Sequence, residues 1–254
     1  TVGDVCEVVG FEHLDHALSR GKGAIVLIGH YGANQMIMPA LGHNGYAMNQ
    51  LSAPPTVWAE ILKETRTTAA YERVLQRRWE LEQRLPVRHI NVFRFMRPAV
   101  ECLHRNEVLG LAFDGGGGRS WTSVSLLDRT ANVSIQPAQL ARKTGAVILP
   151  TRVWRTPGMT RHIIEIEPPL ACVEDGPDAI ALDMQSYADR FSEWVRERPE
   201  QYLPFLVVRR EMRGLDVQPF FEDYPEVEGG GLSPEEAALR LQQAAERSGA
   251  LGEG

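Results

Sequence analysis

Several patterns that would place this chain in a familiar class are missing from it. Its three cysteines, Cys6, Cys102 and Cys172, lie far apart and form no Cys-x-x-Cys pair, so we expect neither a disulfide framework nor a metal site. No apolar run approaches the roughly 18 residues of a membrane-spanning helix. The chain also lacks a Gly-Lys-Ser/Thr phosphate loop and a Gly-x-Ser-x-Gly elbow, which argues against a P-loop protein and an α/β-hydrolase.

Basic charge is also scarce, and nearly all of it is arginine. The formal net charge is −6, which argues against a nucleic-acid partner because phosphate neutralisation requires a clustered basic surface. Only three of the 27 Lys and Arg residues are lysines, namely Lys22, Lys63 and Lys143. The arginine excess has two interpretations: genomic base composition, or recognition of phosphate and carboxylate groups by the guanidinium fork.

Short apolar runs alternate with helical patterns along the 254 residues, which suffice for one sizeable α/β domain. The predicted strands are 24–28, 108–113, 146–153 and 162–167. The predicted helices are 34–41, 57–85, 95–105, 134–144, 179–198 and 233–247. We therefore expect a mixed β-sheet flanked by helices in a domain of residues 1–215. Residues 216–254 are expected to form an acidic, Gly-rich linker and a peripheral C-terminal helix.

His30 is the residue that points most directly to chemistry. It follows the strand 24–28 and Gly29, at the carboxyl end of a strand, where ligands bind in open α/β sheets. A lone histidine is more often structural, but an imidazole on this rim can take a proton from a hydroxyl group if a partner orients it. Gln35 lies about one turn into the following helix. Asp114 ends the strand 108–113, where its alternative role is to cap the glycine loop 115–118.

Four sequence blocks resemble, in order, those of the bacterial lipid A biosynthesis acyltransferases. The actinobacterial phosphatidylinositol mannoside acyltransferases share the first block, and both belong to the lysophospholipid acyltransferase superfamily. The blocks are Gly-Lys-Gly-Ala-Ile-Val-Leu-Ile-Gly-His-Tyr-Gly-Ala-Asn-Gln (21–35), the strand with its acid (107–114), Pro-Ala-Gln-Leu-Ala-Arg-Lys-Thr-Gly-Ala-Val-Ile-Leu-Pro (137–150) and Trp-Val-Arg-Glu-Arg-Pro-Glu-Gln-Tyr (194–202). Val-Gly-Phe-Glu-His-Leu (9–14) resembles the usual lead-in.

This resemblance implies an enzyme that moves an acyl group from acyl-CoA or acyl carrier protein to a hydroxyl of a lipid or glycolipid. His30 would act as general base, and the family's acid five residues later would orient it. The thioester is a co-substrate, and no resident cofactor or metal is implied. We expect action at the cytoplasmic face of the inner membrane, with the basic stretch 57–85 near the lipid headgroups. Because the chain starts at Thr1, it is expected to be processed or truncated, so attachment is either peripheral or through an N-terminal segment absent here.

Two departures from the family pattern affect the predicted site. Gln35 stands where the family has Asp or Glu, so it is an engineered change, the native residue of an enzyme that uses another acid, or the mark of a chain without turnover. Asp114 is the best substitute acid. The family's arginine after the second strand is absent from 46–51, so Arg119 or Arg152 would contact the headgroup phosphate.

The remaining substrate-binding candidates and the rival functions follow from the same pattern. Met36 and Trp58 are predicted to line an acyl groove, and Ser134, which caps the helix 134–144, lies with them among the substrate-binding candidates. One rival function keeps the fold but transfers an aminoacyl or other group. The other is a catalytically silent lipid-binding protein.

Overall fold

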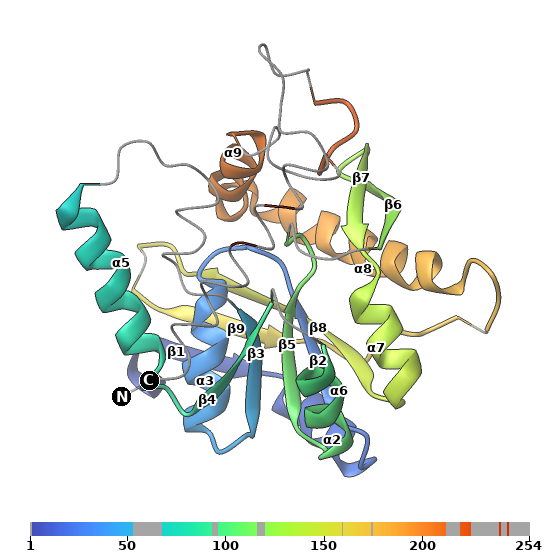
Figure 1. The fold of residues 1–254 in the computed structure, drawn as a ribbon, viewed down its shortest axis with the longest axis horizontal. Helices are drawn as coiled ribbons and strands as arrows, with labels where there is room; N and C mark the ends of the chain where they lie inside the picture. Colours follow the sequence, from blue (N-terminus) through green and yellow to red (C-terminus); the bar gives the residue numbers. More distant parts are fainter. Residues whose placement is uncertain are drawn as a thin grey trace.

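The central feature of the computed structural model is one seven-stranded sheet (Figure 1). Its strands run in the order β1 (Cys6–Val9), β9 (His162–Ile166), β8 (Val147–Arg155), β2 (Ala24–Ile28), β5 (Val108–Ala112), β3 (Met48–Ser52) and β4 (Val87–Asn91). Only the β8–β9 pair is antiparallel. The structure describes residues 2–52, 68–92, 96–115, 120–158, 160–173, 175–211, 219–224, 239 and 243.

Helices cover both faces of this sheet, and the strand sequences reflect it. The helices are α1 (Val2–Val5), α2 (Phe11–Ser19), η1 (Asn34–Met36), α3 (Ile37–His43), α5 (Ala69–Glu82), α6 (Arg97–His104), α7 (Gln136–Thr144), α8 (Ala179–Glu197), η2 (Pro199–Gln201) and α9 (Leu203–Glu211). Ile25 and Leu27 of β2 point into a core with α6, α7 and α8, whereas Val26 and Ile28 point into a core with α2 and α3. Strands buried on both faces in this way require continuous apolar runs.

A separate two-stranded hairpin, β6 (Trp121–Leu126) and β7 (Arg129–Ser134), packs on α8 at the side of the molecule away from α5 (Figure 1). The segment 219–224 adds to it, since Phe221 forms a bridge with Ala131 and both Phe220 and Phe221 are buried. This segment lies beyond the boundary predicted at residue 215, yet its phenylalanines belong to the main core.

The mixed α/β sheet flanked by helices is confirmed, with local differences. The predicted helix 34–41 consists of η1 and α3, and the described part of the predicted helix 57–85 is helical over Ala69–Glu82. The helix α7 begins at Gln136, not at Ser134, because Ser134 is the last residue of β7. The predicted helix 233–247 falls outside the described residues, apart from two isolated positions.

The sequence analysis did not predict β1, β3, β4 or the hairpin. β3 contains Asn49 and Gln50, which are buried although polar, and β4 lies at the edge of the sheet with Ile90 as its one buried residue. Among the described residues, no helix is both long and apolar enough to span a bilayer.

Candidate active site

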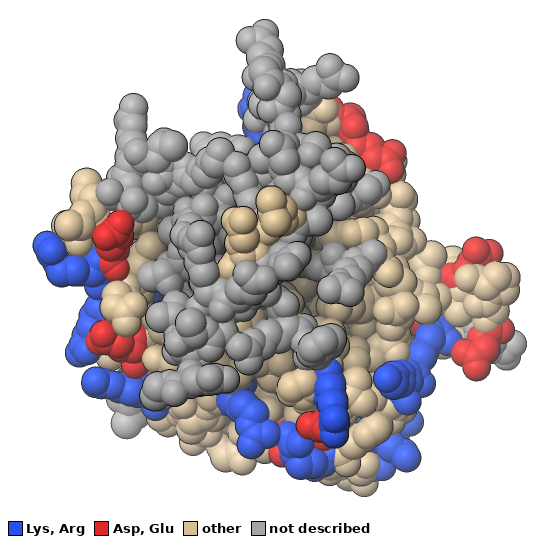
Figure 2. Space-filling view, in the orientation of Figure 1, with Lys and Arg blue, Asp and Glu red and all other residues tan. Residues whose placement is uncertain are grey.

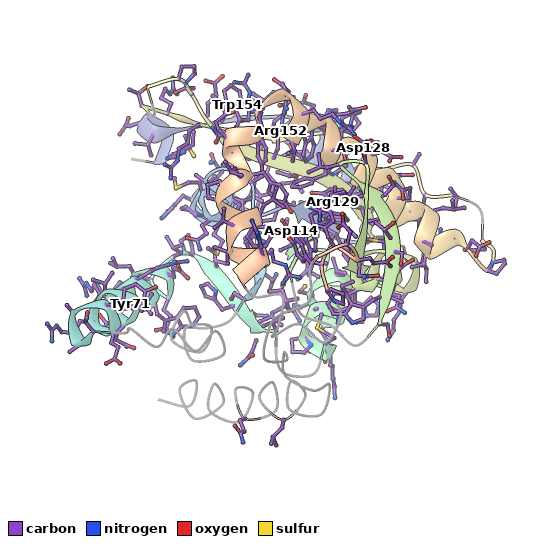
Figure 3. All side chains as sticks on the ribbon, turned by 90° about the horizontal axis from the view of Figure 1, so that it is seen from above. Tyr71, Asp114, Asp128, Arg129, Arg152 and Trp154 are labelled. Atoms are coloured by element: carbon purple, nitrogen blue, oxygen red, sulfur yellow. The ribbon has the colours of Figure 1, made fainter. Side chains whose placement is uncertain are left out.

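The site forms where β2 and β5 end side by side. These parallel strands pair Ile28 with Ala112, and the backbone N–H of Phe113 donates to the carbonyl of Ile28 at 2.7 Å. His30 and Asp114 each follow two residues after the end of their strand, so the shared register brings them together. Figure 3 shows Asp114 near the middle of the molecule, well inside the outer helices.

The His30 imidazole and the Asp114 carboxylate form a hydrogen-bonded pair. His30 Nδ1 lies 2.7 Å from Asp114 Oδ1, and the backbone N–H of His30 donates to Oδ1 at 3.1 Å and to Oδ2 at 2.9 Å. The Asp114 side chain is fully buried, whereas 38% of the His30 side chain is exposed. An ionised carboxylate only accepts hydrogen bonds, so Nδ1 carries the proton and Nε2 of the neutral ring bears the lone pair.

The surroundings of Asp114 keep its carboxylate ionised. Burial raises the pKa of this group, but the His30 charge, the hydrogen bonds from His30 and the nearby Tyr202 hydroxyl together lower the pKa below its ordinary value. Conversely, burial and the charge on Asp114 raise the pKa of the Tyr202 phenol and of the Tyr187 phenol well above 10. The Tyr202 hydroxyl faces the carboxylate without a hydrogen bond of ordinary geometry to any described residue.

The turn that carries His30 depends on two glycines. A Cβ on Gly29 would lie 2.2 Å from the Phe191 ring, and Gly32 has a φ of +57° with no room for a Cβ, which would lie 2.1 Å from the Val153 carbonyl oxygen. The backbone N–H of Gly32 donates to the carbonyl of Gln201 at 2.8 Å. The N–H groups of His30 and Gly32 are therefore both engaged within the protein.

Three residues of the C-terminal part complete the site, and the sequence analysis assigned no role to them. They are Gln201, which holds the turn, Tyr202, which faces Asp114, and Phe205 of α9. The Phe205 and His30 rings are stacked, with centroids 4.2 Å apart and planes 5° apart. The Pro-Glu-Gln-Tyr block was the signal that could have located Gln201 and Tyr202.

The other predicted residues form no hydrogen bond with the pair in the part of the chain that the structure describes. Gln35 is exposed in η1, and no hydrogen bond in the described part of the chain joins it to His30. Met36 is half-buried and packs against the core on the α2 and α3 face. Ser134 is buried, and its hydroxyl accepts the backbone N–H of Gln136 at 3.3 Å, so it supports the start of α7.

The predicted phosphate-binding arginines receive no direct support. Arg152 Nε lies 2.7 Å from Glu165, and its NH1 lies 2.7 Å from Glu197, so two carboxylates already hold its guanidinium. Figure 3 shows Arg152 on the β8 side, apart from Asp114. Arg119 and Trp58 lie outside the described residues. Within the described ranges, no group of three His, Cys, Asp or Glu side chains could hold a metal ion.

The fold and the site together define an α/β protein in which a buried carboxylate orients a partly exposed histidine at the carboxyl ends of parallel strands. The chain belongs to the bacterial lipid A biosynthesis acyltransferase family, whose model matches residues 1–207. That match confirms the resemblance seen in the sequence blocks.

Two curated relatives carry the same name. They are the phosphatidylinositol mannoside acyltransferases of Mycobacterium tuberculosis strains CDC 1551 / Oshkosh and ATCC 25618 / H37Rv. Each is 28% identical to this chain over 200 residues, which cover 76% of this chain and 56% of the relative. The chain therefore spans little more than half the length of these relatives.

Proposed function

We propose that this protein transfers an acyl group from an acyl thioester to a hydroxyl of a lipid or glycolipid, with His30 as general base. The observation that carries the proposal is the 2.7 Å contact between His30 Nδ1 and the buried Asp114 carboxylate, which leaves Nε2 as the basic nitrogen. Family membership and the named function of the two relatives support the acyl group and the lipid acceptor.

The proton transfers of this reaction require only His30 and Asp114. His30 Nε2 takes the proton of the acceptor hydroxyl while its oxygen attacks the thioester carbonyl. The tetrahedral intermediate then collapses, the C–S bond breaks, and the imidazolium returns the proton to the leaving thiolate. Asp114 stays ionised and stabilises the imidazolium while it exists. The donor, acyl-CoA or acyl carrier protein, is a co-substrate that arrives and leaves with each turnover.

Asp114 also bears on the alternative of a catalytically silent protein. That alternative arose because Gln35, a neutral amide, stands at the family's acidic position. The structure offers a carboxylate to the same imidazole from a different strand, so the lack of an acid at position 35 no longer favours a silent protein.

Action at a membrane surface is part of the same proposal, and α5 is the element that supports it. Its exposed residues include Tyr71 and Val74, the latter 63% exposed, and the arginines Arg73, Arg77 and Arg78, and Arg84 follows just after the helix ends. Figure 2 shows blue and red residues together along the edge of the molecule where α5 lies. Arg77 and Arg78 pair with Glu80 and Glu82, so Arg73 and Arg84 are the arginines we expect to meet anionic headgroups at the cytoplasmic face of the inner membrane.

The first test of the reaction is a transfer assay. Acyl-CoA and acyl carrier protein thioesters, and one aminoacyl thioester, are offered with a panel of lysolipids and mannosylated glycolipids. The expected result is ester formation by the wild type from one acyl donor and its loss in His30→Ala. His104→Ala, at the end of α6, is the matched control and should keep activity.

Two outcomes contradict the proposal. Equal rates in the wild type and His30→Ala would remove His30 from the chemistry. Transfer only from the aminoacyl thioester would mean that the site transfers an aminoacyl group instead of an acyl group.

The membrane contact has a test of its own. Binding to phosphatidylglycerol vesicles, measured by sedimentation, should weaken in the double variant Arg73→Glu/Arg84→Glu. Unchanged binding would exclude α5 as the contact.

A further inference from the structure

The stack of Phe205 on His30 has consequences beyond the histidine–carboxylate pair. A single hydrogen bond from Nδ1 fixes one edge of the imidazole, but the ring can still pivot about the line to Asp114 Oδ1. Phe205 contacts the face of the ring, with planes only 5° apart. Edge and face are thereby both constrained, and Nε2 receives a defined direction.

Phe205 can serve this purpose because its own position is fixed. It is half-buried against the main core, and its ring lies 5.7 Å from that of Tyr202, which is fully buried. Tyr202 in turn meets Phe191 edge to face at 4.9 Å. The two residues also share a turn, since the backbone N–H of Phe205 donates to the carbonyl of Tyr202 at 3.0 Å. The stack therefore rests on a chain of aromatic contacts that reaches α8.

We propose that Phe205 is a positioning residue for His30, which holds the plane of the imidazole and stabilises the imidazolium formed during turnover. This inference rests on the proposed function. An aromatic face attracts a cation within about 6 Å of its centroid, and the 4.2 Å stack meets that condition. Asp114 at the edge and Phe205 at the face then stabilise the same transient charge.

The kinetic test compares substitutions that keep or remove the π-face. Phe205→Leu keeps an apolar side chain on α9 but removes the aromatic face, so kcat should fall about fivefold to thirtyfold. KM for the acceptor should stay within about twofold, because the imidazolium forms only after binding. Phe205→Tyr should recover most of kcat. Leu206→Ala is the control, because Leu206 packs against the same core but offers no aromatic face to His30, and its kcat should stay near that of the wild type.

The spectroscopic test does not depend on turnover. In NMR spectra of the full chain, the ring current of Phe205 should shift the His30 ring protons upfield, and this shift should disappear in Phe205→Leu but persist in Phe205→Tyr. The ¹⁵N signals of the His30 ring should report the Nδ1-protonated tautomer in both proteins, because Asp114 fixes the tautomer, whereas the ring-proton signals in Phe205→Leu should average over several ring orientations.

The kinetic and spectroscopic tests together distinguish a failure of this inference from a failure of the proposed function. Unchanged His30 ring signals in Phe205→Leu overturn the inference, even if the wild type is an active acyltransferase. A shifted signal with unchanged kcat, or a kcat that rises because Phe205 blocked the site, overturns it as well. If the wild type transfers nothing, the proposed function fails, and the NMR arm still decides whether Phe205 positions the ring.

Discussion

Asp114 accepts hydrogen bonds from both the backbone and the ring of His30, a residue 84 positions earlier in the chain. The backbone N–H lies 2.9 Å from Oδ2, while Nδ1 lies 2.7 Å from Oδ1. One buried carboxylate thus fixes the turn after β2 and the tautomer of the histidine that the turn presents.

The Asp114→Asn variant should lose most of its activity, because an amide cannot stabilise the imidazolium by charge and can impose the wrong tautomer. In a comparable pair, this change costs about four orders of magnitude in kcat. Gln35→Glu should change kcat little, since Gln35 is exposed and makes no hydrogen bond to His30 in the described part of the chain. The acyl-transfer assay therefore tells whether Asp114 or an acid at position 35 supports His30. A large gain in Gln35→Glu together with an active Asp114→Asn would reverse our assignment.

The stability contributed by Asp114 should depend on pH with a defined sign. Burial raises its pKa, but His30 and the hydrogen bonds outweigh burial, so the pKa in the folded state is lower than the value of about 3.9 in an unfolded chain. The stabilisation is therefore fully present above about pH 4 and disappears as the pH falls through the lowered pKa. The difference in free energy of unfolding between wild type and Asp114→Asn, measured in urea, should shrink on acidification. A difference that grows would mean that burial dominates.

Gly32→Ala should be much more damaging than Gly45→Ala. Both glycines have positive φ values, +57° and +88°, so an alanine costs each about 1 kcal/mol from the backbone alone. At Gly32 the new Cβ would also lie 2.1 Å from the carbonyl oxygen of Val153, whereas at Gly45 nothing lies within 4 Å. We expect Gly32→Ala to lose about 3 kcal/mol or more of stability and most of its activity.

Thermal unfolding and the transfer assay together check this comparison. Gly45→Ala should remain active and should have a melting temperature slightly below that of the wild type. Equal melting temperatures in the two variants would show that the turn after β2 tolerates a side chain, contrary to the contact described here.

The three cysteines should differ sharply in reactivity. Cys172 is exposed, whereas Cys6 and Cys102 are buried. Burial raises the pKa of all three thiols, that of Cys102 to about 11, so the cysteines differ mainly in access. Iodoacetamide at pH 8 should therefore modify Cys172 alone in the folded protein. All three should react after unfolding. Mass spectrometry of tryptic peptides reads out the sites, and rapid labelling of Cys102 in the folded state would contradict the core packing around α6.

The sequence by itself determined the central strands and the position of the histidine. The runs 24–28 and 108–113 are continuously apolar because helices bury both faces of β2 and β5, and such runs can be recognised in the sequence alone. The strands β3 and β4 could not be recognised in this way. Asn49 and Gln50 interrupt the apolar pattern of β3, and β4 lies at the edge of the sheet, where alternation is weak.

Only the tertiary structure decided which side chain contacts the His30 ring. Gln35 is close in sequence and stands at the family's acidic position, whereas the sequence indicated Asp114 only as the best substitute acid. The pairing of β2 with β5 places the two strand ends side by side, and α9 then brings Phe205 onto the imidazole. Local patterns determine where a strand ends, but contacts between distant segments depend on the strand order and on the helices that pack against the sheet, which no short stretch of sequence encodes.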